Sequence, residues 1–225
     1  MTLKPHSRAW YAQLAAETGV YEYPWTQVLS APSGETLFDT LLEGLLTPEV
    51  HVLEAGCGHG RDAQRYAGRV RSYTGYDFIP AYVTRARENV PEAEFVVWDS
   101  SREPVPERFK GRFDLVFSRR GPTSVVLHLL ELCAPGARVL CVHPEDGTVE
   151  ARVRERLAGV GLAPDAQWQV RVNGFLPTLE DFVLYRRFHD DERTPEALGA
   201  EWNEGAERQG FPIEERRYIW LVRVA

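Results

Sequence analysis

The chain has 225 residues, a length that fits one domain of the larger α/β size. Hydrophobic residues make up 44% and charged residues 26%, as in soluble globular proteins, and the net charge of −7 makes bulk attraction to nucleic acid weak. The three cysteines, Cys57, Cys133 and Cys141, lack CxxC spacing, so we expect a reduced, cytoplasmic protein without disulfides. The first ten residues contain no apolar signal-peptide core, and no run approaches the ~18 apolar residues that span a membrane.

Two helices are predicted before the first strand of the sheet. They cover residues 5–17 and residues 33–46, and Ser33 is a possible N-cap of the second. Between them, residues 21–25 (YEYPW) place three aromatic side chains around a proline. Because a sheet does not need these helices, residues 1–47 form an N-terminal arm. The arm is either a packing element or a lid over a site, with the aromatic side chains as walls.

Residues 52–60, VLEAGCGHG, join a short apolar strand to a helix through three alternating glycines. Glycine lets the backbone bend sharply and approach a ligand closely, and a strand, glycine turn and helix form the nucleotide site of many α/β sheets. The spacing is GxGxG with Glu54 before it, whereas the dinucleotide fingerprint is GxGxxG and places a pyrophosphate at the helix N-terminus. The acid therefore favours a ligand with a positively charged end and disfavours an NAD-type oxidoreductase.

Strand-like and helical segments alternate through the middle of the chain. This alternation indicates a mostly parallel sheet with right-handed crossovers, and the nearly continuous apolar strands agree, because parallel sheets are buried on both faces. The predicted strands are 72–77, 94–99, 113–118 and 137–143, and the predicted helices are 61–70, 79–89, 124–133 and 148–158.

The last third of the chain is less regular. A helix pair lies between two strands and is an insertion relative to a minimal sheet. The predicted strands are 167–172 and 217–224, and the helices are 179–188 and 195–209.

We therefore predict a three-layer α/β/α Rossmann-like sandwich. Its sheet has seven mostly parallel strands with the last one antiparallel, preceded by the helical arm and carrying a helical insertion before the last strand. Residues 1–225 form a single domain, in which residues 48–145 are the core and residues 146–225 the C-terminal half of the sheet.

Residues 51–143 resemble the core of a class I S-adenosylmethionine-dependent methyltransferase. Four features occur in order: the acid and glycines of VLEAGCGHG, the acid ending the next strand (GYDF), the acid after the third strand (VVWDS), and FDLVFS followed by a helix and APGARVLCV. The phrase AGCGHGRDA also resembles small bacterial methyltransferases of the tellurite-resistance kind. The resemblance covers under half of the chain and implies S-adenosylmethionine as the cofactor.

Each part of this cofactor has a candidate partner. Glu54 is expected to favour the ammonium group, and Asp77 to accept hydrogen bonds from the ribose hydroxyls. Asp99 is expected at the adenine amino group, although a turn residue is the alternative; Phe78 lies against adenine or belongs to the core. The candidate cofactor-binding residues are Glu54, Gly56, Cys57, Gly58, Gly60, Asp77, Phe78, Asp99, Ser100 and Ser118.

Candidates for the chemistry follow the fourth and fifth strands of the core. Arg119 and Arg120 are either a clamp for a carboxylate or phosphate of the acceptor, or structural ion pairs. His143 is a candidate general base, and a hydrogen bond within a loop is the alternative. Residues 118–122, SRRGP, lack the Asn/Asp-Pro-Pro-aromatic signature of amino methyltransferases acting on adenine or glutamine, and no Pro-Cys nucleophile is present. No histidine pair has metal-ligand spacing, so no metal is expected.

The predicted function is methyl transfer to a small-molecule acceptor. An RNA or protein methyltransferase is one alternative, but it needs a basic face, and the short runs at residues 69–71 and 186–187 offer little. A non-catalytic module that binds S-adenosylmethionine is the other. We expect no nucleic-acid or membrane partner, and the sequence leaves the oligomeric state open.

Overall fold

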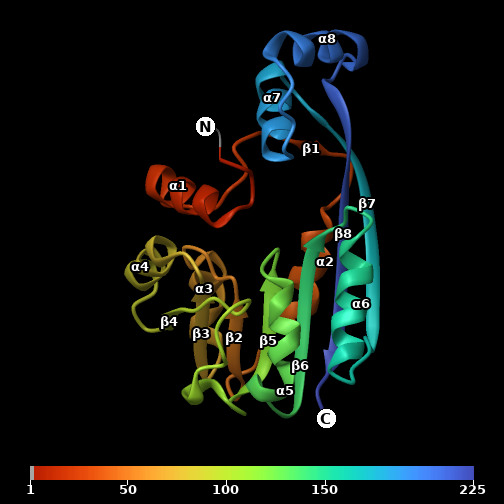
Figure 1. Ribbon diagram of the computed structural model, residues 1–225. Coiled ribbons are helices and arrows are strands. Elements are labelled where there is room, and N and C mark those ends of the chain that lie inside the picture. The colour runs from red at the N-terminus through yellow and green to blue at the C-terminus, as the bar shows by residue number, and fades with distance from the viewer. Residues whose placement is uncertain (1–2) are drawn as a thin grey trace.

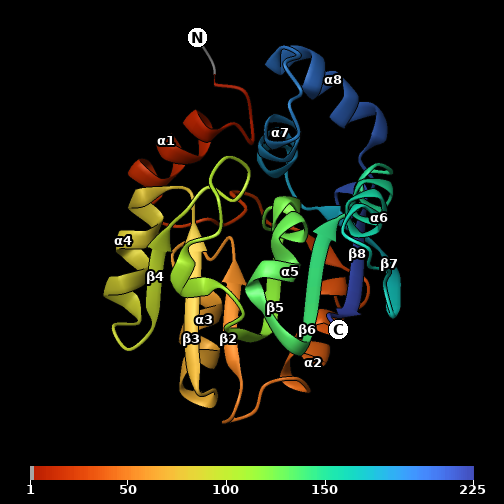
Figure 2. The same cartoon turned by 60° about the horizontal axis from the view of Figure 1, so that its bottom comes forward.

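The computed structural model describes residues 3–225 and contains one mixed sheet with helices on both faces (Figures 1 and 2). The strand order is β1-β7-β8-β6-β5-β2-β3-β4. The strands are β1 (Val28–Leu29), β2 (His51–Ala55), β3 (Ser72–Asp77), β4 (Glu94–Val97), β5 (Phe113–Arg119), β6 (Cys133–Pro144), β7 (Ala166–Leu176) and β8 (Phe211–Arg223). The α-helices are α1 (Arg8–Thr18), α2 (Gly34–Glu43), α3 (Arg61–Tyr66), α4 (Pro80–Asn89), α5 (Leu129–Leu132), α6 (Val149–Gly159), α7 (Leu179–Phe188) and α8 (Pro195–Gly205).

The direction of the strands confirms the predicted sheet. Strands β2 to β6 are parallel to one another, and β8 is antiparallel to both β6 and β7. The strand count is eight rather than seven, because Val28 and Leu29 of the arm pair with Phe175 and Gly174 of β7. A strand of two residues is too short to show an alternating pattern in the sequence.

Helices on the two faces of the sheet make three layers (Figure 2). An apolar cluster lies on each face of the sheet. On one face, side chains of α2, α3 and α4 pack on the sheet, and Phe38 and Leu42 of α2 are fully buried there. On the other face, α5 and α6 pack through residues such as Leu132 and Leu157. Helix α2 begins where the sequence predicts, because the Ser33 hydroxyl caps it by accepting a hydrogen bond from the Glu35 N–H at 3.1 Å.

Strands β7 and β8 are longer than predicted and extend past the sheet. Strand β6 has its last partner at Pro144, opposite Arg217, but the β7–β8 pairing continues to Leu176 and Phe211. Residues 172–215, which we call the upper lobe, comprise this extension and helices α7 and α8; Figure 1 shows them above the rest of the molecule. The lobe has its own apolar cluster, formed by Trp25, Leu176, Phe182, Phe188 and Leu198.

Three predicted helices are wrong in length or type. The predicted helix 61–70 is α3, which ends at Tyr66, followed by a 3₁₀ turn, Ala67–Arg69. Residues 124–133 form a 3₁₀ turn, Thr123–His128, followed by the four-residue α5, and Cys133 already pairs with Phe113 at the start of β6. Helix α8 ends at Gly205 rather than at residue 209. Among residues 3–225, no helix is both long and apolar enough to cross a membrane.

Candidate functional site

A cavity of about 380 Å³ lies where the loops after β2, β3, β4 and β5 meet, with residues of the arm on its other side. Its volume is in the range of sites for small ligands. Parallel strands bring the residues that follow them to one edge of the sheet, which is where α/β proteins bind ligands. Of the candidates from the sequence, the lining contains Gly56, Gly58, Asp77, Phe78, Asp99, Ser100, Arg119 and Arg120.

The glycine turn forms one wall of the cavity, and its glycines have different roles. A Cβ on Gly56 would lie 2.8 Å from Pro122 Cδ, so Gly56 allows the loop after β5 to pack on the turn. Gly58 has φ +51° and open space where its Cβ would be, which leaves the backbone accessible to a ligand. Gly60 does not line the cavity; it precedes α3, and its Cβ would lie 3.2 Å from Ala86 of α4.

Asp77 ends β3 and is buried in the wall of the cavity. Its Oδ2 accepts a hydrogen bond from the Gly58 N–H at 3.1 Å, and its Oδ1 accepts one from the Ile79 N–H at 2.9 Å. Burial raises the pKa of Asp77 to about 6, although these backbone donors oppose the shift. The carboxylate thus holds the glycine turn against the end of β3 while it faces the cavity.

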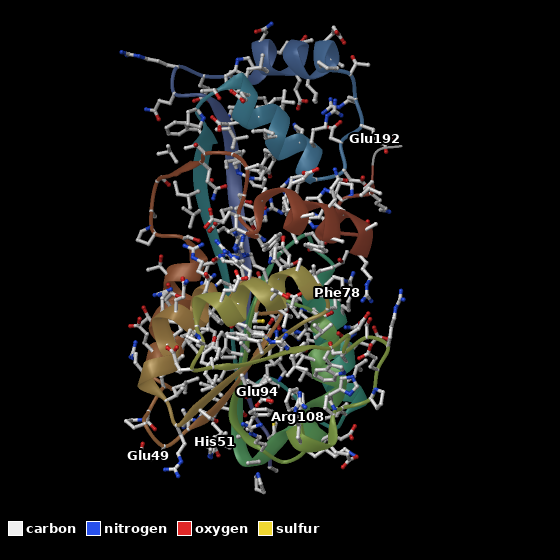
Figure 3. The ribbon with its side chains drawn as sticks, turned by 90° about the vertical axis from the view of Figure 1, so that its left-hand side faces the viewer. Glu49, His51, Phe78, Glu94, Arg108 and Glu192 are labelled. Atoms are coloured by element: carbon white, nitrogen blue, oxygen red, sulfur yellow. The ribbon has the colours of Figure 1, made fainter. Side chains whose placement is uncertain are left out.

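The predicted adenine end of the cavity is covered by the arm. The Arg8 Nη1 donates to Asp99 Oδ2 at 3.0 Å, and the Arg8 guanidinium lies 5.5 Å from the centre of the Phe78 ring. The Tyr11 ring meets Phe78 edge-on with centroids 5.8 Å apart, and Figure 3 shows Phe78 beneath α1. Asp99 therefore faces the cavity, as predicted, but shares its carboxylate with a cation of the arm.

Ser100 lies in the floor of the cavity with its side chain already bonded. Its Oγ is 2.8 Å from the Ser124 Oγ and 3.2 Å from the Tyr76 hydroxyl, and its carbonyl is 2.7 Å from the His128 Nε2. This network connects the loop after β4 to the 3₁₀ turn after β5.

Glu54 does not reach the cavity, contrary to its predicted contact with the ammonium group. It is buried behind the glycine turn, where its Oε2 accepts a hydrogen bond from the Tyr73 hydroxyl at 2.6 Å. Burial, and then the charge of Asp62, raise the pKa of Glu54 well above its ordinary value. The carboxyl group is thus part of the interior beneath the site.

In the described part of the chain, three further candidates do not line the cavity. The Cys57 thiol is buried, and its Sγ lies 3.7 Å from the Gly58 carbonyl. The Ser118 hydroxyl donates to the Ala55 carbonyl at 2.8 Å and so joins β5 to β2. His143 lies in β6 beside the Trp220 ring, and burial, followed by the charge of Arg152, lowers its pKa to about 4. A general base must reach the proton that it removes, so this position does not support the predicted role of His143.

Arg119 is fully occupied by ion pairs, which favours the structural alternative for this residue. Its Nε donates to Asp62 at 2.7 Å, its Nη2 to Asp39 at 2.5 Å and its Nη1 to Glu35 at 3.3 Å. The guanidinium also lies 4.8 Å from the centre of the Phe38 ring. Arg119 therefore ties the end of β5 to α2 and α3.

Arg120 has a different environment. Its backbone has φ +56°, a left-handed conformation that is rare for a residue with a long side chain. Its guanidinium lies 4.6 Å from the centre of the Tyr23 ring and 5.5 Å from that of Tyr21, and its Nε is 3.4 Å from Glu35 Oε1. This Nε is buried and has no hydrogen-bond partner in the described part of the chain.

A second cavity, of about 470 Å³, adjoins the first through Arg119 and Arg120, which line both. Its walls come from the arm, α2, α3 and β8, and they are rich in charged side chains. Most of its acids are paired: Glu35, Asp39 and Asp62 contact Arg119, and Glu215 contacts Arg217.

The arm supplies lining residues that the sequence did not identify as site residues. His6, Arg8 and Tyr11 line the first cavity, and Tyr21 belongs to the aromatic stretch that was considered for a lid. The Tyr82 hydroxyl donates to the Val20 carbonyl at 3.3 Å and fastens the arm to α4. The lining thus supports a cover over the site for residues 6–21, whereas α2, at the end of the arm, is a packing element on the sheet.

Comparison with known proteins agrees with this geometry. Residues 52–140 match the family model of a methyltransferase domain. An uncharacterized methyltransferase from Synechocystis sp. is 35% identical over 119 residues, which cover 49% of this chain and 52% of the relative. Residues 52–140 thus form a methyltransferase domain of the class I S-adenosylmethionine-dependent type.

Two further similar proteins differ in how much of their length aligns with this chain. Trans-aconitate 2-methyltransferase from Delftia acidovorans is 34% identical over 123 residues, or 49% of this chain and 44% of that protein. The chain thus spans about half the length of the curated methyltransferases it matches. A crystal structure of a protein of unknown function from Deinococcus radiodurans is 41% identical, with 96% of this chain and 99% of that chain covered at a TM-score of 0.83. This structure extends the likeness to the arm and the upper lobe.

Proposed function

We propose that this methyltransferase-family protein binds S-adenosylmethionine in the first cavity and transfers its methyl group to a small-molecule acceptor. The observation that carries the proposal is the convergence of Gly58, Asp77 and Phe78 on that cavity. The open space at Gly58 admits a ligand close to the backbone, the Asp77 carboxylate suits ribose hydroxyls, and the Phe78 ring suits a planar base. When bound, S-adenosylmethionine supplies an electrophilic methyl group.

The arm covers the site, and this cover supports a small molecule as the methyl acceptor. The arm forms a wall of both cavities, and the Tyr21 and Tyr23 side chains lie over Arg120 between them. A covered site of this size suits a small ligand better than an RNA duplex or a folded protein. The relative from Delftia is named for a small acid, trans-aconitate, which agrees with this size of acceptor.

Ligand-dependent melting tests the cofactor. At about 100 times its dissociation constant, a ligand adds about 2.7 kcal/mol to the free energy of unfolding, so we expect S-adenosylmethionine or S-adenosylhomocysteine to raise the melting temperature by roughly 5–10 °C. Asp77→Asn should remove most of this shift, and Asp190→Asn, an exposed position in the upper lobe, should retain it.

The melting measurement, combined with an assay of methyl transfer, separates the alternative functions. A shift with NAD and none with S-adenosylmethionine contradicts the proposal. A normal shift without methyl transfer to a total metabolite extract favours a non-catalytic module, and transfer only to a protein or RNA fraction favours the macromolecular alternative.

A further inference from the structure

Arg120 lies where the two cavities meet, and we propose that it holds a carboxylate of the acceptor, whose oxygen receives the methyl group. This inference rests on the proposed function and adds the chemical class of the acceptor to it.

The loop that carries Arg120 is fixed in an unusual conformation. Arg120 has φ +56°, which costs of order 1–3 kcal/mol for a residue with a Cβ. The next residue, Gly121, packs so closely that a Cβ there would lie 2.3 Å from the Ala55 carbonyl oxygen. The Arg120 backbone N–H donates to the Val142 carbonyl at 2.8 Å. The strain is therefore held by the surrounding contacts, as is common for residues placed for a ligand.

The charge of Arg120 is only partly compensated by the protein. Arg119 contacts three carboxylates, whereas Arg120 has a single ion-pair contact, at 3.4 Å, and its Nε–H has no hydrogen-bond partner among the described residues. Its side chain is 10% exposed. A buried guanidinium favours further acceptors for its N–H groups, and a carboxylate matches its planar geometry with two parallel hydrogen bonds.

The position of Arg120 also suits a reaction with a cationic methyl donor. The loop of Arg120 packs directly on the glycine turn, since a Cβ on Gly56 would touch Gly121 and Pro122 at 3.0 Å and 2.8 Å. The sulfonium of S-adenosylmethionine bound at the glycine turn would repel the Arg120 guanidinium in a site of low dielectric constant. An anionic acceptor between the two cavities is attracted by both charges, and a neutral or cationic acceptor is not.

Two groups that face Arg120, Tyr21 and Glu35, are poor general bases, and a carboxylate acceptor needs no base. Burial raises the pKa of the Tyr21 hydroxyl well above its ordinary value. Burial alone would also raise the pKa of Glu35, but the charges of Arg120, Arg217 and Arg119 outweigh it and lower that pKa. A hydroxyl or ammonium acceptor needs a base to take its proton, whereas a carboxylate has no proton to lose.

The reaction is a displacement without proton transfer. A lone pair of the carboxylate oxygen forms the new bond to the methyl carbon, the carbon–sulfur bond breaks, and its electron pair stays on sulfur. The products are a methyl ester and the neutral thioether S-adenosylhomocysteine, so one negative and one positive charge are neutralised together.

Binding of the acceptor is measured first, on protein saturated with S-adenosylhomocysteine. The probes are trans-aconitate and its trimethyl ester, which differ in charge at the same carbon skeleton. We expect the acid to bind the parent protein and Arg71→Met, an exposed arginine at the opposite edge of the sheet, with the same affinity. Arg120→Met should weaken binding of the acid at least 100-fold, Arg120→Lys about tenfold, and both variants should bind S-adenosylhomocysteine within twofold of the parent.

The second measurement identifies the acceptor atom without knowledge of the natural acceptor. Metabolite extract and protein extract are incubated separately with the enzyme and S-adenosylmethionine labelled in the methyl group. We expect label in the metabolite fraction that is released as volatile methanol by alkali, as from a methyl ester. Alkali-labile label confined to the protein fraction identifies a protein carboxylate and contradicts the small-molecule acceptor of the inference.

Two results overturn the inference while leaving the proposed function intact: alkali-stable methyl products only, or equal binding of the acid and its ester with no effect of Arg120→Met. Intact binding of S-adenosylhomocysteine with no transfer to either extract contradicts the proposed function itself, and the inference fails with it.

Discussion

Asp77 is a buried carboxyl group whose ionisation opposes folding. Its pKa is raised to about 6 in the native protein, so the native state keeps a proton that the unfolded chain loses near pH 4. Between about pH 4 and pH 6, the free energy of unfolding therefore falls as the pH rises, by about 3 kcal/mol from this group. The carboxylate is retained despite this cost, as expected of a group that serves ligand binding.

Asp77→Asn should change this pH dependence. The variant cannot ionise, so its stability relative to the parent should increase by about 3 kcal/mol between pH 4 and pH 7. Urea unfolding at both pH values measures the difference, and the loss of one backbone acceptor by the amide lowers stability equally at both. Parallel stability profiles for parent and variant would show that Asp77 titrates as in the unfolded chain.

For single residues, the sequence predicted which kinds of side chain lie near the site better than it predicted the direction in which each side chain points. Asp77 ends a strand of the core and Phe78 follows it, and both line the cavity because the ends of parallel strands meet at one edge. Glu54 is in the right strand, but its side chain points into the interior and meets Tyr73 of β3, two residues before its register partner Gly75. Such a cross-strand partner becomes visible only when the strands are in register.

The glycine turn shows how an element can be tested without disturbing the rest of the fold. Gly58 and Gly111 both have positive φ, +51° and +61°, and both have open space at the Cβ position. Alanine at either position should cost about 1–2 kcal/mol of stability through backbone strain alone. Only Gly58 lines the cavity, so Gly58→Ala should also weaken binding of S-adenosylhomocysteine at least tenfold.

Calorimetric titration of both variants decides this prediction. Similar melting temperatures with a loss of affinity confined to Gly58→Ala support a ligand close to the turn. Unchanged affinity in Gly58→Ala would place the ligand elsewhere.

Regular elements were predictable where apolar spacing covered the whole element. Helix α2 and strands β3 and β5 begin within about a residue of their predicted positions, which is the usual margin for element ends. The predicted helix 124–133 failed because its apolar residues also fit a 3₁₀ turn, and because Cys133 pairs with Phe113. The extra length of β7 and β8 comes from their pairing with each other beyond β6, a tertiary effect that local sequence does not contain.

At the scale of the whole molecule, stability is distributed unevenly between the sheet and the upper lobe. The clusters on the two faces of the sheet are extensive, whereas the lobe rests on the small cluster around Phe182 and Leu198. Regions with few buried apolar contacts open at lower free energy. We therefore expect backbone amides of residues 172–215 to exchange with solvent before those of β2 and β5.

Leu198→Ala should increase the difference in hydrogen exchange between the upper lobe and the sheet. Leu198 is fully buried, and its truncation should cost about 2–5 kcal/mol. Hydrogen exchange should then accelerate in residues 172–215 alone, whereas Leu157→Ala, equally buried beneath α6, should accelerate exchange in the sheet. Equal acceleration everywhere in both variants would mean that lobe and sheet unfold as one unit.

The strand order has a consequence for the sequence of events during synthesis. Strand β8 leaves the ribosome after every other strand of this sheet, yet it lies between β6 and β7. Until it is made, β7 has no neighbour connecting it to the parallel strands, and β1, which pairs with β7 alone in the described sheet, is not connected to them either. The parallel strands β2 to β6 can assemble while the chain is still growing. The second cavity, whose walls include Leu29 of β1 and Glu215 and Arg217 of β8, is then completed last.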